Sequence, residues 1–485
     1  MNIFNILLFL LLSTVSVSYG WGMRGTIIGG EKGAMLPGAF LGLLIALFSG
    51  SELLADSPWM LAGIGALSMY CGGNMTYGET LHLSLAENSP HVKKGLIALF
   101  IKGGIWFGIC NGVISLFISV IAGYYRLWQI LVFFGMLPIF ALLFYFIFNF
   151  PYDPEKGKTP RVYFSITRKE TWGGIAGIFI ELIVFSAVFR DWATVIMAGG
   201  AFISGAIGWV IGQLFHIGAN KPGKNGKRLF EKLNQKNAVD AWKIMECVLG
   251  AIGGLGSSLT FILSKPLFTE KFAVIDTFGF FTIIKNENTC KLLVILYGVI
   301  LLADSMQYFL YPTKNKKYNK KLLKMNMISK ETYNREIEIA PEDSEGYMKY
   351  KKFCEKSEFA IYSIIPMFFC MLGSYHTAAV VAFPLVMLVL CQEVLEKCFK
   401  AGKGNYLWKI MHMIPPSAVF ILILTSSKAM EQSVTILMYT LFYEMAYFVL
   451  KLLENDDIEL SNVKKTVHGY FIACCIVINI LIFLV

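Results

Sequence analysis

Long apolar segments recur along the whole chain, and they limit its fold more than any other feature. The hydrocarbon core of a bilayer is about 30 Å thick, and a helix needs about 20 apolar residues to cross it. About fourteen segments approach or exceed that length, and several are short enough to be broken or re-entrant. They lie near 3–19, 34–50, 58–73, 95–120, 127–150, 172–189, 193–216, 241–263, 291–311, 358–373, 377–391, 408–425, 432–451 and 467–485.

The composition supports a membrane class. The 485 residues are 56% hydrophobic and 16% charged, whereas a soluble domain has about 45–50% apolar and about 25% charged residues. A soluble core of this size would leave too few polar residues to cover it. Disordered, fibrous and disulfide-rich secreted classes are excluded, and no nucleic-acid partner is expected. We predict an all-α polytopic integral membrane protein with about 14 transmembrane helices (range about 12–14).

Basic residues predict the orientation in the membrane. If the N-terminus lies outside, the gaps that face inside hold 32 Lys and Arg, and those that face outside hold 6. Such asymmetry is what the positive-inside rule describes. Both termini are therefore predicted outside, in the plasma membrane. The first segment, 3–19, is read as a retained helix, and a cleaved signal peptide is the alternative.

We divide the chain into an N-terminal glycine-rich transmembrane bundle (1–311), a basic cytoplasmic connector (312–357) and a C-terminal transmembrane bundle (358–485). The connector is either an interfacial amphipathic helix or a solvated loop. The motif GAxxxGA occurs at 33–39 and again at 200–206, on helices predicted to run in opposite directions. It indicates either a weak inverted repeat or simply close helix packing.

The stretch from Gly20 to Gly33 is rich in glycine and is predicted to be irregular. Irregular backbone at membrane depth is tolerated where it lines a cavity. Its charged residues Arg24, Glu31 and Lys32 are therefore candidates to bind a solute. The planar guanidinium group of an arginine can donate two parallel hydrogen bonds to a carboxylate or phosphate. The alternative is an ordinary cytoplasmic loop whose cations set the topology.

A second polar group lies between Gly72 and His82. Tyr77, Glu79 and His82 place a phenol, a carboxylate and an imidazole within six residues. In a helix, Glu79 and His82 would share a face, where they could relay a proton or hold a hydroxyl group. A capped helix start at the membrane interface explains the same residues equally well.

Acidic residues within apolar segments are the sharpest functional signal, because each is costly in a membrane unless paired or neutral. Glu181, Glu246 and Asp304 are predicted to bind a coupling ion or proton, and the alternative is that they only join helices. Lys243 lies three residues before Glu246 and could neutralise it. The ten cysteines form no C-x-x-C pair and the histidines no H-E-x-x-H motif, so neither a metal nor a cofactor is predicted.

These features favour a secondary transporter, coupled to an ion or a proton, for a small polar or anionic solute. The alternative is a membrane-embedded transferase that acts on a lipid-linked or acyl donor. A membrane scaffold is a third reading, although it gives no reason for several buried acids. An enzyme is therefore the less favoured reading. The expected partners are membrane lipids and the solute, and the sequence leaves the oligomeric state open.

Overall fold

The computed structural model describes residues 2–24, 30–75, 77–85, 91–153, 157, 158, 160–162, 164, 170–222, 226–229, 241–309, 330, 350, 353, 354 and 356–377. Within these ranges every regular element is a helix, as predicted. Most of the predicted connector 312–357 and the last four predicted membrane segments lie outside the described residues, so the division into three domains stays a prediction.

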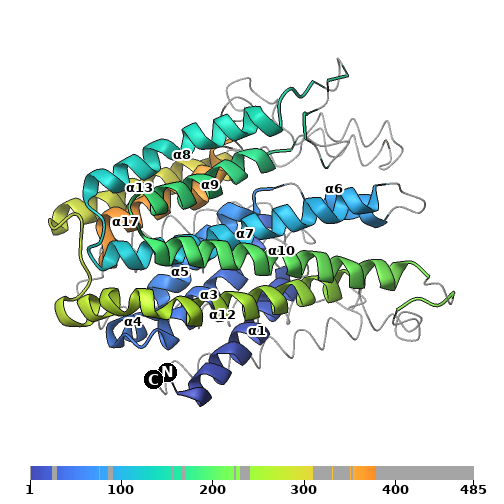
Figure 1. Ribbon diagram of the computed structural model, residues 1–485. Helices are drawn as coiled ribbons and strands as arrows, with labels where there is room; N and C mark the ends of the chain where they lie inside the picture. The colour runs from blue at the N-terminus through green and yellow to red at the C-terminus, as the bar shows by residue number, and fades with distance from the viewer. Residues whose placement is uncertain are drawn as a thin grey trace.

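The helices follow the predicted apolar segments closely (Figure 1). Their bounds are α1 (Ile3–Arg24), α2 (Gly30–Gly33), α3 (Met35–Phe48), α4 (Glu52–Asp56), α5 (Pro58–Gly73), α6 (Gly78–Leu85), α7 (Val92–Ile121), α8 (Leu127–Phe148), α9 (Trp172–Val188), α10 (Trp192–Asn220), α12 (Ala241–Phe278), α13 (Glu287–Phe309), the π-helix η2 (Ala360–Ile364) and α17 (Ile365–Thr377).

Five of the described helices, α1, α7, α8, α10 and α12, are long and apolar enough to cross a membrane. The helices α3 and α9 are apolar but shorter. These lengths and compositions are consistent with an integral membrane protein. The larger count of about fourteen spans stays a prediction.

Glycines bring the long helices together in antiparallel pairs. A Cβ atom at Gly254 of α12 would lie 2.4 Å from the Ser13 carbonyl oxygen of α1, and one at Gly250 would lie 2.5 Å from that of Val17. The residue numbers of the contacts rise along α12 as they fall along α1, so the two helices are antiparallel. Small residues permit this close approach of backbones between membrane helices.

The same antiparallel packing joins α7 to α10 and α10 to α12. Gly103 of α7 faces the Gly205 carbonyl of α10, and Gly212 of α10 faces the Met245 carbonyl of α12. The last turns of α1 and α10 consequently lie at the same end of the bundle as the first turns of α7 and α12. We call this the Arg24 end, and the opposite end, which contains the α9–α10 turn, the Asp191 end.

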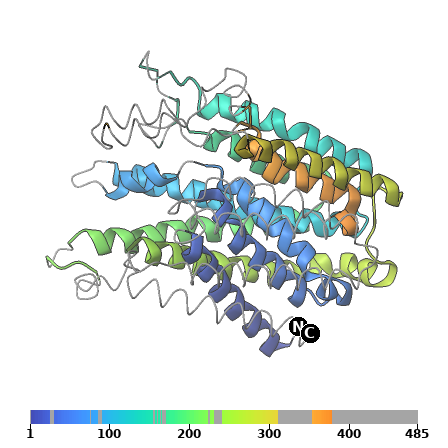
Figure 2. The same cartoon turned by 180° about the vertical axis from the view of Figure 1, so that it is seen from behind.

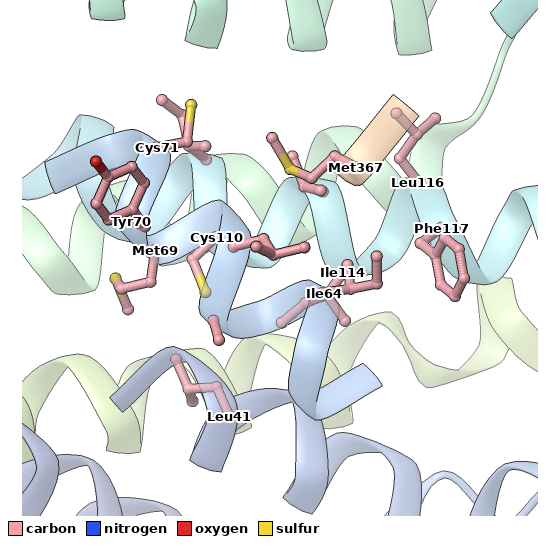
Figure 3. Close-up of a cluster of buried hydrophobic side chains, with 14 of the residues drawn as sticks. Leu41, Ile64, Met69, Tyr70, Cys71, Cys110, Ile114, Leu116, Phe117 and Met367 are labelled. Atoms are coloured by element: carbon pink, nitrogen blue, oxygen red, sulfur yellow. The ribbon is translucent and has the colours of Figure 1, made fainter. Parts of the chain in front are cut away.

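Apolar side chains from distant parts of the sequence form the core (Figure 3). Leu41 of α3, Ile64 of α5, Ile114 of α7 and Met367 of α17 are all part of one buried cluster. Figure 2 shows α13 and α17 beside each other on one flank of the bundle, where α17 also contacts α5, α7 and α8. The predicted segment near 358–373, which we assigned to the C-terminal bundle, therefore packs against helices of the N-terminal bundle.

Two segment boundaries differ from the prediction. The helix α1 continues through Gly20 and Gly22 to Arg24, and α2 covers Gly30–Gly33, so the stretch predicted to be irregular is helical in both of its described parts. A Cβ at Gly20 would lie 2.9 Å from Pro37, and one at Gly22 would lie 2.7 Å from the Cys247 sulfur. These glycines serve close packing and do not bend the chain. The helix α12 also continues past the predicted end at 263 and reaches Phe278, with Pro266 inside it.

Candidate functional site

The end of α1 carries Arg24 into the interior of the bundle. The Arg24 side chain is only 1% exposed, although the helix that ends at Arg24 begins at the surface. The close approaches of Gly20 to α3 and of Gly22 to α12 fix the last turn of α1 between those helices. A cation in this last turn also interacts favourably with the negative end of the helix dipole.

Aromatic rings surround the guanidinium group. The Arg24 Cζ atom lies 4.5 Å from the ring centroid of Tyr77, 4.9 Å from that of Trp106 and 5.2 Å from that of Trp21. The Trp209 ring packs against the other three rings, with centroids 5.6–6.2 Å away. We call these four rings the aromatic box. Ring faces attract a cation, and the attraction strengthens where water is excluded.

One carboxylate lies between two cations beside the aromatic box. Glu246 Oε1 is 3.9 Å from Arg24 Nη1, and Glu246 Oε2 is 2.8 Å from Lys243 Nζ. Lys243 also donates to the Gly22 carbonyl oxygen at 2.9 Å, which ties α12 to the end of α1. We call Arg24, Lys243, Glu246 and the aromatic box the Arg24 centre. Its described ionisable groups, taken in their ordinary forms, carry one net positive charge.

The Arg24 centre also holds hydrogen-bond donors that lack an acceptor. The Trp106 indole N–H donates to the Met69 carbonyl oxygen at 2.7 Å. The indole N–H groups of Trp21 and Trp209 are buried and, among the described residues, meet no acceptor. Because nearly all buried donors in proteins are satisfied, two such groups in one centre need an explanation.

The short helix α6 positions Tyr77. The Tyr77 hydroxyl accepts a hydrogen bond from Arg24. Just after it, Thr80 accepts from Lys102 of α7 at 2.8 Å, and Ser84 accepts from Gln213 of α10. Polar contacts to two long helices therefore hold α6 next to the Arg24 centre.

A second buried ion pair lies one helical turn from the aromatic box. Lys102 Nζ, one turn before Trp106 on α7, is 2.8 Å from Glu170 Oε1, and both side chains are buried. The other Glu170 oxygen accepts from the Phe164 backbone N–H. Sequence reasoning missed Glu170 because it lies in a polar gap, although Lys102, a cation within an apolar segment, signalled that a partner must exist.

Lys32 and Asp304 belong to a separate group. Lys32 Nζ is 3.4 Å from Glu358 Oε1 and lies over the Tyr362 ring. The Tyr362 hydroxyl donates to Asp304 Oδ2 at 3.0 Å. The structure therefore brings Lys32 and Asp304 close to the same tyrosine, and it brings Arg24, Tyr77 and Glu246 together elsewhere.

The remaining predicted site residues are dispersed. Glu181 is buried on α9, and its Oε2 atom has no partner among the described residues. His82 is exposed, with its ring 6.4 Å from that of Trp242. The side chains of Glu31 and Glu79 lie outside the described part of the chain, so the predicted pairing of Glu79 with His82 stays a prediction. The helix α6 itself confirms that the chain is helical at Glu79.

Among the described residues, no three His, Cys, Asp or Glu side chains lie close enough together to hold a metal ion. Comparison with family models, with curated proteins and with solved structures finds no match to this chain. Its function has to be inferred from the chemistry of the Arg24 centre.

Proposed function

We propose that the protein is a secondary transporter for a small anionic solute, and that the Arg24 centre binds the negative group of this solute. The observation that carries the proposal is that the buried Arg24 centre contains hydrogen-bond donors without acceptors among the described residues. Two cations share one carboxylate there, beside two indole N–H groups without an acceptor among the described residues. A carboxylate or phosphate group supplies acceptors for these two indole N–H groups and can also bind the guanidinium group of Arg24.

Burial of this centre between membrane helices strengthens the proposal. Ionisable residues inside membrane segments are costly and are found mostly at substrate and ion pathways. The 3.9 Å contact between Arg24 and Glu246 is too long for a hydrogen bond. We propose that the solute takes the place of Glu246 beside Arg24. Glu246 then stays with Lys243 or takes up the coupling proton, which would link solute binding to protonation.

The wider arrangement fits the same proposal. We propose about fourteen spans in the plasma membrane with both termini outside, as the distribution of basic residues predicts. Glycines line the contacts of α12 with α1 and with α10, and we propose that these helices change their packing during transport. Glu181 and Asp304 remain candidates for further proton-binding groups.

Thermal unfolding of the purified protein tests the proposal. Inorganic phosphate, succinate, citrate and glutamate are added separately over a range of pH, and flux of any stabilising anion is then measured in liposomes. A ligand at 100 times its Kd stabilises the folded state by about 2.7 kcal/mol. We expect Glu246→Gln to abolish the pH dependence of stabilisation. Trp209→Phe, which replaces the indole with a smaller aromatic ring that has no N–H donor, should weaken binding about fivefold to tenfold.

Glu52→Gln is the matched control, because Glu52 is exposed on α4 and should behave as wild type. Stabilisation by a polyprenyl phosphate or an acyl-CoA, without flux and without any effect of Glu246→Gln, would overturn the transporter proposal in favour of the transferase. Binding of a small anion that is equally strong in Trp209→Phe would overturn the assignment of the binding site.

A further inference from the structure

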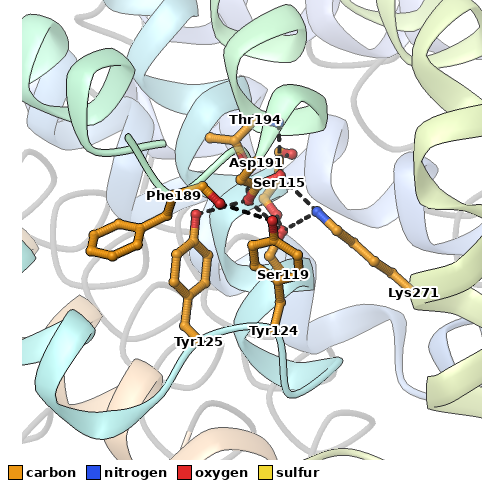
Figure 4. Close-up of polar contacts among 8 residues, drawn as sticks. All are labelled: Ser115, Ser119, Tyr124, Tyr125, Phe189, Asp191, Thr194 and Lys271. Carbon is orange, nitrogen blue, oxygen red and sulfur yellow. Dashed lines mark hydrogen bonds and ion pairs between the residues drawn. The ribbon is translucent and has the colours of Figure 1, made fainter. Parts of the chain in front are cut away.

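A buried carboxylate organises the Asp191 end of the bundle (Figure 4). Asp191 Oδ2 accepts hydrogen bonds from the hydroxyls of Ser119, Tyr125 and Thr194, at 2.7, 3.1 and 2.8 Å. Asp191 Oδ1 lies 2.7 Å from Lys271 Nζ. Burial and the neighbouring carboxylate raise the pKa of the Tyr125 phenol, so it remains a donor. These contacts join α7, α10 and α12, and we call Asp191, Ser119, Tyr125, Thr194 and Lys271 the Asp191 network.

A cavity of about 320 Å³ opens beside the Asp191 network. Its lining includes the exposed rings of Tyr124 and Trp192 and the exposed charges of Arg190 and Glu270. The charges of Lys271 and Asp191 neutralise each other within the Asp191 network. Within the described residues neither Arg190 nor Glu270 forms an ion pair, so the cavity presents one available cation and one available anion.

The helix α9 ends at the rim of the cavity with a residue in the left-handed conformation. Arg190 has a φ of 60°, in the left-handed region that residues other than glycine rarely adopt. The backbone hydrogen bond from Asp191 to the Ser186 carbonyl, at 2.8 Å, holds this turn. The Arg190 N–H also donates to the Ala187 carbonyl oxygen at 3.0 Å, and the two bonds form the Schellman motif that ends many helices. This cap fixes the position of Arg190 at the rim of the cavity.

An exposed apolar stripe leads away from the cavity along the bundle. Leu255, Leu259, Leu263 and Leu267 of α12 are all exposed and recur every four residues, so they share one face of the helix. Leu267 also lines the cavity. From Leu255 to Leu267 the stripe measures about 18 Å, which exceeds half the thickness of a hydrocarbon core of about 30 Å.

The helix α10 supplies a second apolar edge beside this stripe. Ile196, Ile203 and Ile207 are exposed on α10, which packs against α12. A Cβ atom at Gly199, between the first two of these residues, would meet no atom within 4 Å. The cavity with its charged lining is therefore continuous with apolar surface that can accommodate a hydrocarbon chain.

We propose that this cavity binds the headgroup of a zwitterionic aminophospholipid, with one acyl chain along the leucine stripe. Arg190 binds the phosphate, Glu270 accepts hydrogen bonds from the ammonium group, and Tyr124 and Trp192 flank the headgroup. Tyrosine and tryptophan are favoured at this depth, where the chains end and the headgroups begin. The proposal stands independently of the transported solute.

The balance of charge selects the headgroup. An anionic headgroup would satisfy Arg190 but leave Glu270 beside negative charge, which is unfavourable. A choline headgroup carries a positive charge but has no N–H to donate to Glu270. Phosphatidylethanolamine satisfies both side chains. Free phosphoethanolamine has the same ammonium group, but its phosphate is a monoester with more negative charge than the phosphodiester of the lipid, and it cannot bury apolar surface along the stripe.

Native mass spectrometry of the detergent-purified full chain tests this proposal. Phosphatidylethanolamine, phosphatidylglycerol, phosphatidylcholine and free phosphoethanolamine are titrated separately. We expect phosphatidylethanolamine to bind about tenfold more tightly than each of the others. Arg190→Gln should weaken its binding by a similar factor, and Glu270→Gln should remove the preference over phosphatidylglycerol. Leu263→Asn should weaken binding of the lipid but not of phosphoethanolamine.

Arg126→Gln is the matched control, because Arg126 is exposed near the same end but does not line the cavity. Equal binding in Arg190→Gln and Arg126→Gln would overturn the proposal, as would a preference for phosphatidylglycerol. Free phosphoethanolamine that binds as tightly as the lipid would show that the stripe plays no part and would overturn the lipid assignment. Thermal unfolding of each variant confirms that the fold is retained.

Discussion

At the scale of single residues, several buried charges among the described residues are paired across the fold, although Glu181 is not in any of these ion pairs. Lys102 lies inside the apolar helix α7, and its partner Glu170 comes from the segment before α9. Removing one member of such a pair leaves an uncompensated buried charge and strongly lowers the free energy of unfolding. Replacing both members with apolar side chains lowers it far less. The pair Lys102–Glu170 and the Arg24 centre are both of this kind.

We expect Glu170→Gln to lower the free energy of unfolding by about 3–5 kcal/mol, because the ammonium group of Lys102 would remain buried opposite a neutral side chain. The double variant Lys102→Met with Glu170→Gln should recover most of that loss. Denaturant titration in detergent micelles measures both. Lys285→Met, at an exposed position, is the control. A double variant as unstable as Glu170→Gln would show that the ion pair itself stabilises the fold.

At the scale of elements, glycines determine which helices meet. The helices α3 and α5 approach so closely that a Cβ atom at Gly42 would lie 1.9 Å from the Leu61 carbonyl oxygen. Gly38 and Gly65 face each other in the same interface. The first GAxxxGA motif thus provides close helix packing, while the inverted repeat that it also indicated stays a prediction.

We predict that Gly42→Ala destabilises the protein by about 1–3 kcal/mol, because the added methyl group forces two backbones apart. Gly135→Ala in α8 is the matched control, since a Cβ there would meet nothing within 4 Å. It should be neutral or stabilising by up to about 1 kcal/mol. The melting temperatures of the two variants provide the comparison, and equal destabilisation would contradict this view of the α3–α5 interface.

At the scale of the whole molecule, antiparallel packing separates two polar regions. The Arg24 centre lies towards one end of the bundle and the Asp191 network lies at the other. Ser51, next to α4, donates to Asp276 near the end of α12 and so belongs to the Asp191 end. The segment at 226–229 follows α10 and belongs to the Arg24 end, where Leu229 bonds to Gly218.

The orientation of these ends can be measured with cysteine labelling on intact cells. We expect a membrane-impermeant thiol reagent to label Glu52→Cys at once and Arg228→Cys only after permeabilisation, because basic residues favour the inside. Wild-type protein, with its native cysteines, gives the background. Immediate labelling of Arg228→Cys alone would show the reverse orientation.

The candidate site was predicted only in part. The sequence indicates Arg24 as a cation in a glycine-rich stretch, Tyr77 as a member of a polar cluster, and Glu246 as an acid within an apolar segment. The sequence linked Glu246 only to Lys243 and did not indicate that Arg24 and Tyr77 would join them. Trp21, Trp106 and Trp209 gave no signal, since an aromatic residue in a membrane helix is ordinary.

By itself, the sequence determined the helical class of the described part of the chain, the positions of most of its helices and the residues whose burial would be costly. These properties depend on the solvation of each segment, which can be evaluated from neighbouring residues alone. Only the tertiary structure decided which polar groups meet. Pairing of Arg24 with Glu246, of Lys102 with Glu170 and of Lys271 with Asp191 depends on which helices pack and in what register. Close contacts along entire helix faces set that register, and no single segment contains both sides of such a contact.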